Sequence, residues 1–333
     1  MTPEELLDSA RVFALPLHRE FRGVTVREGL LFEGPSGWAE FAPFLDHTDA
    51  HAGRWLAAAI EQAYGTWPPP LRARVPVNAI IPMTDAVTTG ELTRAALASG
   101  CTTVKTKVGA DDPANDVARV ATIRAVLDEA GVRGRIRIDT NQRWSAAQAI
   151  ALLPELDAVA GGLEYVEQPV AGRDALRAVR AAVDVPIAVD EGIRLATDPV
   201  AAVAALREVA DVAVLKAIPL GGVRPALAVA EAAGLPVVVS GSLDTVVGLA
   251  SGLWLAACLP NLAGACGLGT GALLRHDVVA SPQPIVDGHL RVERVVPEDP
   301  DPAGLVDDAM RTRWRERLLR AWEHAGMDRG VGA

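Results

Sequence analysis

From residue 75 onward, short apolar runs alternate with longer stretches rich in alanine and leucine. Short apolar runs bounded by turn signals are typical of buried strands, whereas the longer stretches have the spacing of amphipathic helices. Glycines that follow several of the longer stretches indicate helix C-termini. The pattern predicts strands at 75–80, 103–108, 135–140, 163–168, 186–191, 212–218, 236–240 and 265–268, and helices at 85–99, 113–130, 145–160, 173–182, 199–208, 224–233 and 245–259.

Eight strands that alternate with seven helices predict an α/β fold, a modified (β/α)7β barrel of the TIM type. A doubly wound sheet is the alternative. That fold does not require eight regular strands, and no G-x-G-x-x-G fingerprint follows the first of them. The barrel is expected to span residues 76–275 and to carry the active site.

The first 75 residues lack this repeat and predict a separate unit. Alternating segments at 12–17, 24–32 and 38–41 predict short antiparallel strands joined by glycine-rich turns. A helix is predicted over 49–64, and the prolines that follow it end it and supply a linker. Residues 1–75 therefore predict a small α+β capping domain.

The last part of the chain has loop character and then an amphipathic helix. The helical pattern covers 305–324 and has an arginine-rich face and an apolar face. An apolar face of this kind needs a partner surface. We expect residues 276–333 to return and pack on the capping domain.

Composition narrows the function classes. The net charge of −10 disfavours nucleic acid and anionic membrane as partners. Cys101, Cys258 and Cys266 show no C-x-x-C spacing, which indicates reduced thiols rather than disulfides or a zinc site. The first residues lack the pattern of a secretion signal, and the longest apolar run, 245–259, is too short to span a bilayer. A cytoplasmic location is expected, and the oligomeric state stays open.

Lysine is rare in this chain and is confined to predicted strands. Of the 32 basic residues only three are lysine, namely Lys105, Lys107 and Lys216. Arginine keeps its proton in proteins, whereas a desolvated lysine beside another cation can lose it. Because side chains alternate along a strand, Lys105 and Lys107 should lie on one face. These three lysines are therefore candidates for proton transfer, the alternative being strand lysines that are solvated or paired with acids.

Acidic residues follow the neighbouring predicted strands, and in a parallel barrel such strand ends face one pocket. Asp139, Glu167 and Asp190 come from three consecutive strands, with Glu191 next to Asp190. A single Asp after a strand is commonly a helix N-cap, but three converging carboxylates require a cation. Hard oxygen ligands favour Mg²⁺ over zinc. Since strands 2 and 6 lie opposite in a ring of eight, two lysines should face each other across this pocket.

The arrangement resembles the enolase superfamily, and within it the subgroup of muconate-lactonizing enzymes. The resemblance covers nearly the whole chain and is carried by Lys105-Thr-Lys107, Asp139-Thr-Asn141, Glu167-Gln-Pro169, Asp190-Glu191 and Lys216. It implies that Asp139, Glu167 and Asp190 bind Mg²⁺, with Mn²⁺ as the alternative ion. It also implies that Lys107 and Lys216 are the paired acid/base residues. The choice of Asp190 over Glu191 comes from the resemblance alone.

The compact chain and the stretch 240–249 resemble one branch of this subgroup. That branch, in menaquinone biosynthesis, dehydrates 2-succinyl-6-hydroxy-2,4-cyclohexadiene-1-carboxylate to 2-succinylbenzoate. The resemblance implies a syn elimination in which Lys107 takes the proton and returns it to the departing hydroxyl. Lys105 should lower the pKa of Lys107, and Lys216 should act as second acid/base or fixed cation. Expected substrate or support residues are Asn141, Glu191, Ser240, Gly241, Ser242, Gly267 and Gly269, the last five near strand ends 7 and 8, where glycines serve as backbone donors or as tight turns.

Other reactions on the same scaffold remain alternatives. N-succinylamino acid racemisation would use both lysines in turn. Dipeptide epimerases commonly carry Asp-x-Asp where this chain has Gly267-Leu-Gly-Thr270, and muconate cycloisomerases usually have longer chains. A non-enzymatic, metal-stabilised binding barrel is a further alternative, but it leaves the confinement of lysine to pocket-facing strands unexplained. The turn at Gly23-Val24 is the candidate for a loop that closes the site.

Overall fold

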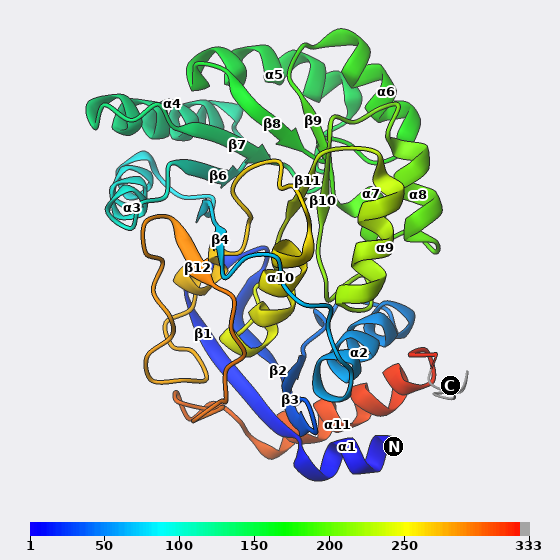
Figure 1. The fold of residues 1–333 in the computed structure, drawn as a ribbon. Helices are drawn as coiled ribbons and strands as arrows, with labels where there is room; N and C mark the ends of the chain where they lie inside the picture. Colours follow the sequence, from blue (N-terminus) through cyan, green and yellow to red (C-terminus); the bar gives the residue numbers. More distant parts are fainter. Residues whose placement is uncertain (327–333) are drawn as a thin grey trace.

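The structure of the protein is a computed structural model that describes residues 1–326. A parallel sheet surrounded by helices forms one half of the molecule, and an antiparallel sheet with helices at both chain ends forms the other (Figure 1). Among the described residues no helix is both long and apolar enough to cross a membrane.

The parallel sheet is a closed barrel, as predicted. Its seven named strands lie in the order β11-β10-β9-β8-β7-β6-β5. A short eighth segment closes the ring, because Cys266 forms a parallel bridge with Val77 and Gly267 forms one with Ser240. The strands are β5 (Ala79–Ile81), β6 (Thr103–Lys107), β7 (Arg135–Asp139), β8 (Leu163–Glu167), β9 (Ile187–Val189), β10 (Val212–Leu215) and β11 (Val237–Val239).

Helices connect successive barrel strands and pack around them (Figure 1). Side chains cap several N-termini; Asp85, Ser145 and Thr245, for example, accept hydrogen bonds from the first-turn amides. A short extra helix, α7 (Glu191–Arg194), follows β9 and was not predicted. The seven predicted helices are α3 (Ala86–Ala98), α4 (Pro113–Glu129), α5 (Ala146–Ala160), α6 (Arg173–Ala182), α8 (Pro199–Leu206), α9 (Val223–Ala233) and α10 (Val246–Cys258).

The first predicted strand, 75–80, is wrong as one element. Its beginning, β4 (Arg74–Pro76), pairs antiparallel with β12 (His289–Arg291), and the barrel strand β5 begins at Ala79. Pro76 has no amide hydrogen to donate and marks the point where the chain leaves one sheet for the other. A single apolar run therefore serves two sheets.

The N-terminal unit contains the predicted three-stranded antiparallel sheet. Its strands are β1 (Arg11–Phe21), β2 (Val24–Gly34) and β3 (Gly37–Phe41), and α2 (Asp49–Tyr64) packs on them. Helix α1 (Pro3–Ser9) was not predicted. Its signal was present, because Thr2 and Glu5 form a capping box around Pro3.

The C-terminal helix α11 (Asp308–Trp322) packs on the capping sheet and on α2. The Trp314 ring is fully buried, meets Phe41 edge to face at 6.0 Å, and donates its Nε1 hydrogen to Glu28 at 2.8 Å. This packing is what the expected C-terminal return requires. The domain boundaries at 75 and 275 remain predictions.

Substituting Trp314 with alanine should lower the free energy of unfolding by about 3–5 kcal/mol, because it opens a cavity in the core shared by α11 and the capping sheet. Denaturant unfolding would measure the loss. Leu319→Ala is the matched control on the same helix, since that side chain is 40% exposed and should change stability by less than about 0.5 kcal/mol. Equal losses in both variants would contradict the packing.

Candidate active site

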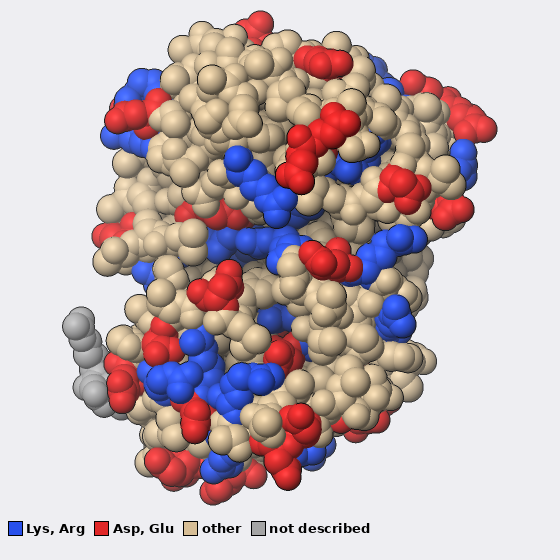
Figure 2. Space-filling view, turned by 180° about the vertical axis from the view of Figure 1, so that it is seen from behind, with Lys and Arg blue, Asp and Glu red and all other residues tan. Residues whose placement is uncertain are grey.

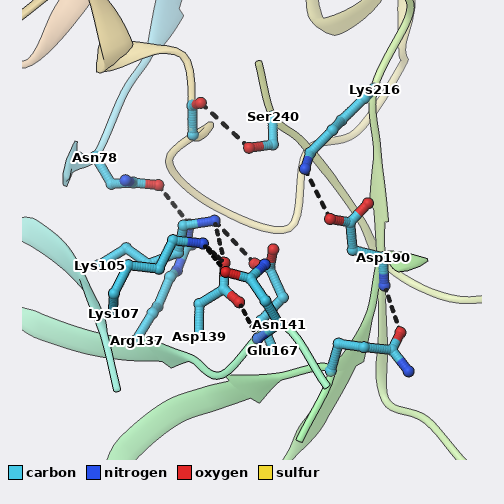
Figure 3. A network of polar contacts seen from close by, with 12 residues as sticks. Asn78, Lys105, Lys107, Arg137, Asp139, Asn141, Glu167, Asp190, Lys216 and Ser240 are labelled. Carbon is cyan, nitrogen blue, oxygen red and sulfur yellow. Dashed lines mark hydrogen bonds and ion pairs between the residues drawn. The ribbon is translucent and has the colours of Figure 1, made fainter. Parts of the chain in front are cut away.

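The predicted site residues converge at the carboxyl ends of β6 to β9 (Figure 3). Lys107 lies in register with Asp139 on β7, and Asp139 lies in register with Glu167 on β8. Asp190 follows β9 directly. Parallel strands end at one mouth of a barrel, so these side chains share one buried neighbourhood.

Amines and carboxylates pair closely within this group. The Lys107 Nζ lies 2.5 Å from Asp139 Oδ2, and the Lys105 Nζ lies 2.9 Å from Glu167 Oε2. On the other side, the Lys216 Nζ lies 2.7 Å from Asp190 Oδ2. The chain's three lysines thus bind the three carboxylates that were predicted as metal ligands.

The two lysines that were expected to face each other share one pocket. Lys107 and Lys216 line one pocket, together with Asp139, Ser240 and Ser242. The capping domain supplies the remaining wall, and its contributors to the pocket are Phe21, Arg22 and Phe44. The pocket therefore lies between the two halves of the molecule.

The turn between β1 and β2 reaches into this pocket. The Lys107 Nζ lies 5.6 Å from the centre of the Phe21 ring, and the next residue, Arg22, also lines the pocket. Arg22 and Gly23 both have positive φ, 56° and 78°, so the turn is tight. The expected closing loop near Gly23-Val24 is thus in contact with the site through the residues just before it.

Asn141 links Lys107 to Glu191. Its Oδ1 accepts from the Lys107 Nζ at 2.8 Å, and its Nδ2 donates to Glu191 Oε1 at 3.1 Å. Arg194 donates to both neighbouring acids, to Asp190 at 3.0 Å and to Glu191 at 2.7 Å. Glu191 is therefore bound by Asn141 and Arg194, whereas Asp190 is bound by Lys216 and Arg194.

The glycines expected as substrate donors have intramolecular roles. The Gly241 amide donates to the Gly267 carbonyl, and the Gly267 amide donates to Val239. A Cβ at Gly267 would lie 2.6 Å from Ser240 Oγ, and one at Gly269 would lie 2.8 Å from the Asn78 carbonyl. The Ser242 amide donates to Asp244. Close packing and barrel closure therefore account for these positions, and Gly269 lines a separate cavity.

Thr270, which sequence reasoning did not select, offers a polar group to the pocket. It lies in a short 3-10 helix, η1 (Gly269–Leu273), and lines the pocket beside the lysines. Its Oγ1 is buried and has no hydrogen-bond partner within residues 1–326. Arg22 and Arg194 were missed too, since surface arginines are common in this sequence and nothing marks these two.

Comparisons with known proteins identify the family. Residues 88–305 match the model of the enolase C-terminal domain-like family, and residues 12–63 match that of the enolase N-terminal domain-like family. The chain is 48% identical to an o-succinylbenzoate synthase of Thermobifida fusca over 97% of this chain and 99% of the relative. The chain belongs to the o-succinylbenzoate synthase family of the enolase superfamily.

Further relatives agree with this membership. An o-succinylbenzoate synthase of Mycobacterium bovis is 47% identical over 91% of this chain and 89% of the relative. Among solved structures, the muconate lactonizing enzyme of Pseudomonas fluorescens superposes with a TM-score of 0.71 at 22% identity, covering 92% of this chain and 97% of that one. The L-Ala-D/L-Glu epimerase of Bacillus subtilis gives 0.69 at 23% identity, covering 81% and 90%. These structures share the fold that the sequence predicted.

In this member of the o-succinylbenzoate synthase family, the two lysines of β6 have opposite electrostatic surroundings. Burial lowers the pKa of Lys107, Asp139 opposes that effect, and the charge of Lys105 lowers it further. For Lys105 burial acts in the same direction, but Glu167 and Asp139 together outweigh it and raise the pKa above its ordinary value. Lys107 is also the more accessible, with 12% of its side chain exposed against 6% for Lys105. The predicted lowering of the Lys107 pKa is confirmed in direction.

The carboxylates divide in the same way. Burial and the charge of Asp139 raise the pKa of Glu167 to about 7. Burial tends to raise the pKa of Asp139, but the charges of Lys107 and Lys105 oppose that effect and hold the pKa below its ordinary value. Burial also tends to raise the pKa of Asp190, but the charges of Arg194 and Lys216 outweigh it and lower the pKa to about 2. Glu167 is thus the one of the three carboxylates whose pKa is raised.

The donor set suits a hard divalent cation in its chemistry. Three carboxylates come from adjacent strands, and Glu167 Oε1 is buried without a hydrogen-bond partner in the described chain. As these side chains stand, no group of three or more His, Cys, Asp or Glu in residues 1–326 is gathered closely enough to hold a metal. The ligand role of Asp139, Glu167 and Asp190 is therefore a proposal.

Basic side chains also gather at the surface between the two halves. Figure 2 shows Lys and Arg along the waist that separates the barrel half from the capping half of that face. This concentration contrasts with the net charge of −10. Figure 2 also shows Asp and Glu at this waist, so the surface there carries charges of both signs.

Proposed function

We propose that this chain dehydrates 2-succinyl-6-hydroxy-2,4-cyclohexadiene-1-carboxylate to 2-succinylbenzoate, with Mg²⁺ as cofactor and Lys107 as the base. The relatives that are 47–48% identical over most of the chain support the reaction. The observation that carries the assignment of the base is the contrast on β6, where one accessible lysine has a lowered pKa beside a lysine with a raised one.

The difficult step is removal of a proton next to a carboxylate, since this places two negative charges on the substrate. When bound, a divalent cation supplies Lewis-acid stabilisation of that charge. Asp139, Glu167 and Asp190 would hold the ion, and the orphaned oxygen of Glu167 supports this role. Lys105 and Lys216, each paired with one of these carboxylates, contribute fixed positive charge near the developing negative charge of the substrate.

Lys107 can perform both halves of the elimination. In its neutral form its Nζ accepts the ring proton beside the carboxylate, and the electron pair of that C–H bond becomes part of the ring. The resulting ammonium returns the proton to the hydroxyl on the neighbouring carbon, which leaves as water while the aromatic ring forms. Asn141 Oδ1, 2.8 Å from the Nζ, orients the amine throughout.

The remaining polar groups support binding. Lys216 lies on the opposite wall and, paired with Asp190 at 2.7 Å, provides a fixed cation. Lys105, whose pKa is raised by Glu167 and Asp139 against the effect of burial, stays charged beside Lys107. Thr270 Oγ1 and the Arg22 guanidinium line the same pocket and are available to the oxygens of the succinyl group.

Turnover of the cyclohexadiene substrate by the purified chain tests the proposal. The expected product is 2-succinylbenzoate, formed with loss of one water and detected by the absorbance and mass of the new aromatic acid. A folded, Mg²⁺-supplied enzyme that leaves the substrate unchanged would contradict the proposed function.

N-succinylamino acid racemisation is the second candidate, because the lysines on opposite walls could reach both faces of an α-carbon. We expect Lys216→Ala to reduce α-proton exchange of N-succinyl amino acids in D₂O far more than it reduces dehydration, since only the two-sided reaction needs both amines. NMR of the exchanged amino acid and product absorbance measure the two rates. Equal losses in both would assign Lys216 to binding or charge stabilisation shared by the two reactions.

A further inference from the structure

Two buried charged residues of the capping sheet reach a pocket-lining loop of the barrel. Arg27 on β2 and Glu40 on β3 are only 2% and 1% exposed. Neither belongs to the pocket that contains the three lysines. Both contact the connection between β11 and α10, residues 240–245, whose first four residues line that pocket.

Arg27 fixes the middle of this connection. Its Nε donates to the Leu243 carbonyl at 2.9 Å, and its second guanidinium nitrogen donates to the Ala42 carbonyl within the capping domain. Leu243 has a φ of 64°, in the left-handed region that costs a residue with a side chain about 1–2 kcal/mol. Such a conformation persists only where its surroundings hold it. The planar guanidinium provides that hold by joining the two carbonyls.

Glu40 fixes the end of the same connection. Its Oε2 accepts from the Thr245 amide at 2.8 Å and from the Thr245 hydroxyl at 2.7 Å. Thr245 in turn caps the first turn of α10. Glu40 also packs closely against the first turn of α10, because a Cβ at Gly248 would lie 2.5 Å from Glu40 Oε2. Arg27 and Glu40, the two residues of the capping domain, also form an ion pair, with 3.6 Å between Arg27 Nη2 and Glu40 Oε1.

We infer that Arg27 and Glu40 are positioning residues that hold the wall 240–243 of the substrate pocket in place from the capping domain. The wall has its productive shape only while the capping sheet is docked on α10. The inference deepens the proposed function and rests on it. It predicts that weakening either contact impairs substrate binding without removing the base, since Lys107 and Lys216 are held by barrel residues.

The surroundings of Glu40 favour an uncharged side chain as the acceptor for Thr245. Glu40 and Asp244 are both buried, and the charges of both oppose the lowering of the Arg27 pKa by burial. Burial, reinforced by Asp244, raises the pKa of Glu40 to about 8 despite the opposing charge of Arg27. Glutamine keeps the shape and one acceptor oxygen of the neutral acid. Glu40→Gln is therefore the conservative variant, and Glu40→Leu is the disruptive one.

Steady-state kinetics of the Mg²⁺-supplied enzyme separate positioning from chemistry. Arg27→Lys keeps the charge but replaces the two separate donor nitrogens of the planar guanidinium with a single compact ammonium, which weakens the hold on the two carbonyls. We expect Arg27→Lys and Glu40→Leu to raise KM for the cyclohexadiene substrate about tenfold, the effect of roughly one lost hydrogen bond, with kcat within about threefold of wild type. Glu40→Gln should stay within about twofold of wild type in both constants.

Gln62→Met is the matched control. Gln62 on α2 is equally buried and also bridges capping domain to α10, since its Nε2 donates to the Val247 carbonyl at 2.8 Å and its Oε1 accepts from Ser251. It touches α10 beyond the connection 240–245. Its loss should lower the melting temperature and leave KM unchanged. An unchanged KM in Arg27→Lys and Glu40→Leu, or an equal rise in Gln62→Met, would overturn the inference.

Hydrogen exchange gives a readout that does not depend on turnover. Amides of residues 242–246 should exchange faster in Arg27→Lys and Glu40→Leu than in wild type, and at the wild-type rate in Gln62→Met. Failure of the wild-type enzyme to turn over would refute the proposed function while leaving this result intact. Protection that is equal in all variants would refute the positioning role itself.

Discussion

Lys107→Ala is expected to abolish dehydration, with kcat lower by about 10⁴-fold, the upper end of what a positioned base contributes. The substitution removes the amine that is both accessible in the pocket and lowered in pKa by burial and Lys105. Lys105 is a poor replacement because, against the effect of burial, Glu167 and Asp139 raise its pKa. Lys216 is a poor replacement because it lies beside Asp190 rather than beside Asp139. Steady-state absorbance measurements at saturating substrate would give kcat.

Lys107→Arg separates charge from proton transfer. Arginine restores a cation next to Asp139 but cannot give up its proton, so it should be nearly as inactive as alanine. Both variants should unfold cooperatively and respond to Mg²⁺ as the wild type does. Turnover retained in either one would remove Lys107 from the mechanism.

Removal of divalent cations should have the second-largest effect. Treatment with EDTA is expected to lower turnover to background, and added Mg²⁺ should restore it, because the substrate dianion then lacks its main charge stabilisation. Asp139→Asn should remain poorly active even at high Mg²⁺. The design separates metal dependence from loss of fold, since circular dichroism before and after EDTA should be the same.

A thermal measurement checks the binding site independently of turnover. Mg²⁺ should raise the melting temperature of the wild-type protein by mass action. Asp139→Asn and Asp190→Asn should reduce that rise, whereas a surface substitution such as Asp174→Asn, whose side chain is 94% exposed, should not. Full activity after exhaustive chelation would refute the assignment of the three acids.

The barrel and its strand ends were predictable because both depend on local pattern. Each strand end carries its functional residue within one or two positions of an apolar run, so spacing alone placed Lys107, Asp139 and Glu167 together. The placement of all three lysines in or directly after strands was also visible without any structure, since Lys105 and Lys107 lie in β6 and Lys216 follows β10. A shared face and a shared barrel mouth follow from periodicity and topology.

What could not be predicted depends on partners far apart in sequence. The break within 75–80 arises because β12, more than 200 residues later, takes the first half of that run. The Arg27 contact joins residues 216 positions apart, and no local pattern marks an arginine that will be buried. For the glycines near strands 7 and 8 the sequence left open both substrate donation and tight turns, because it does not show which amides barrel closure consumes.

The pairing of β4 with β12 and the packing of α11 on α2 have a consequence for biogenesis. Val75 lies opposite Leu290 in that pairing, so β4, the segment just before the first barrel strand, has no partner until residues 289–291 are present. Closing such long loops is slow, and unsatisfied strand edges invite association meanwhile. β4 and the face of α2 that α11 covers therefore stay exposed until residues 289–322 have been synthesised.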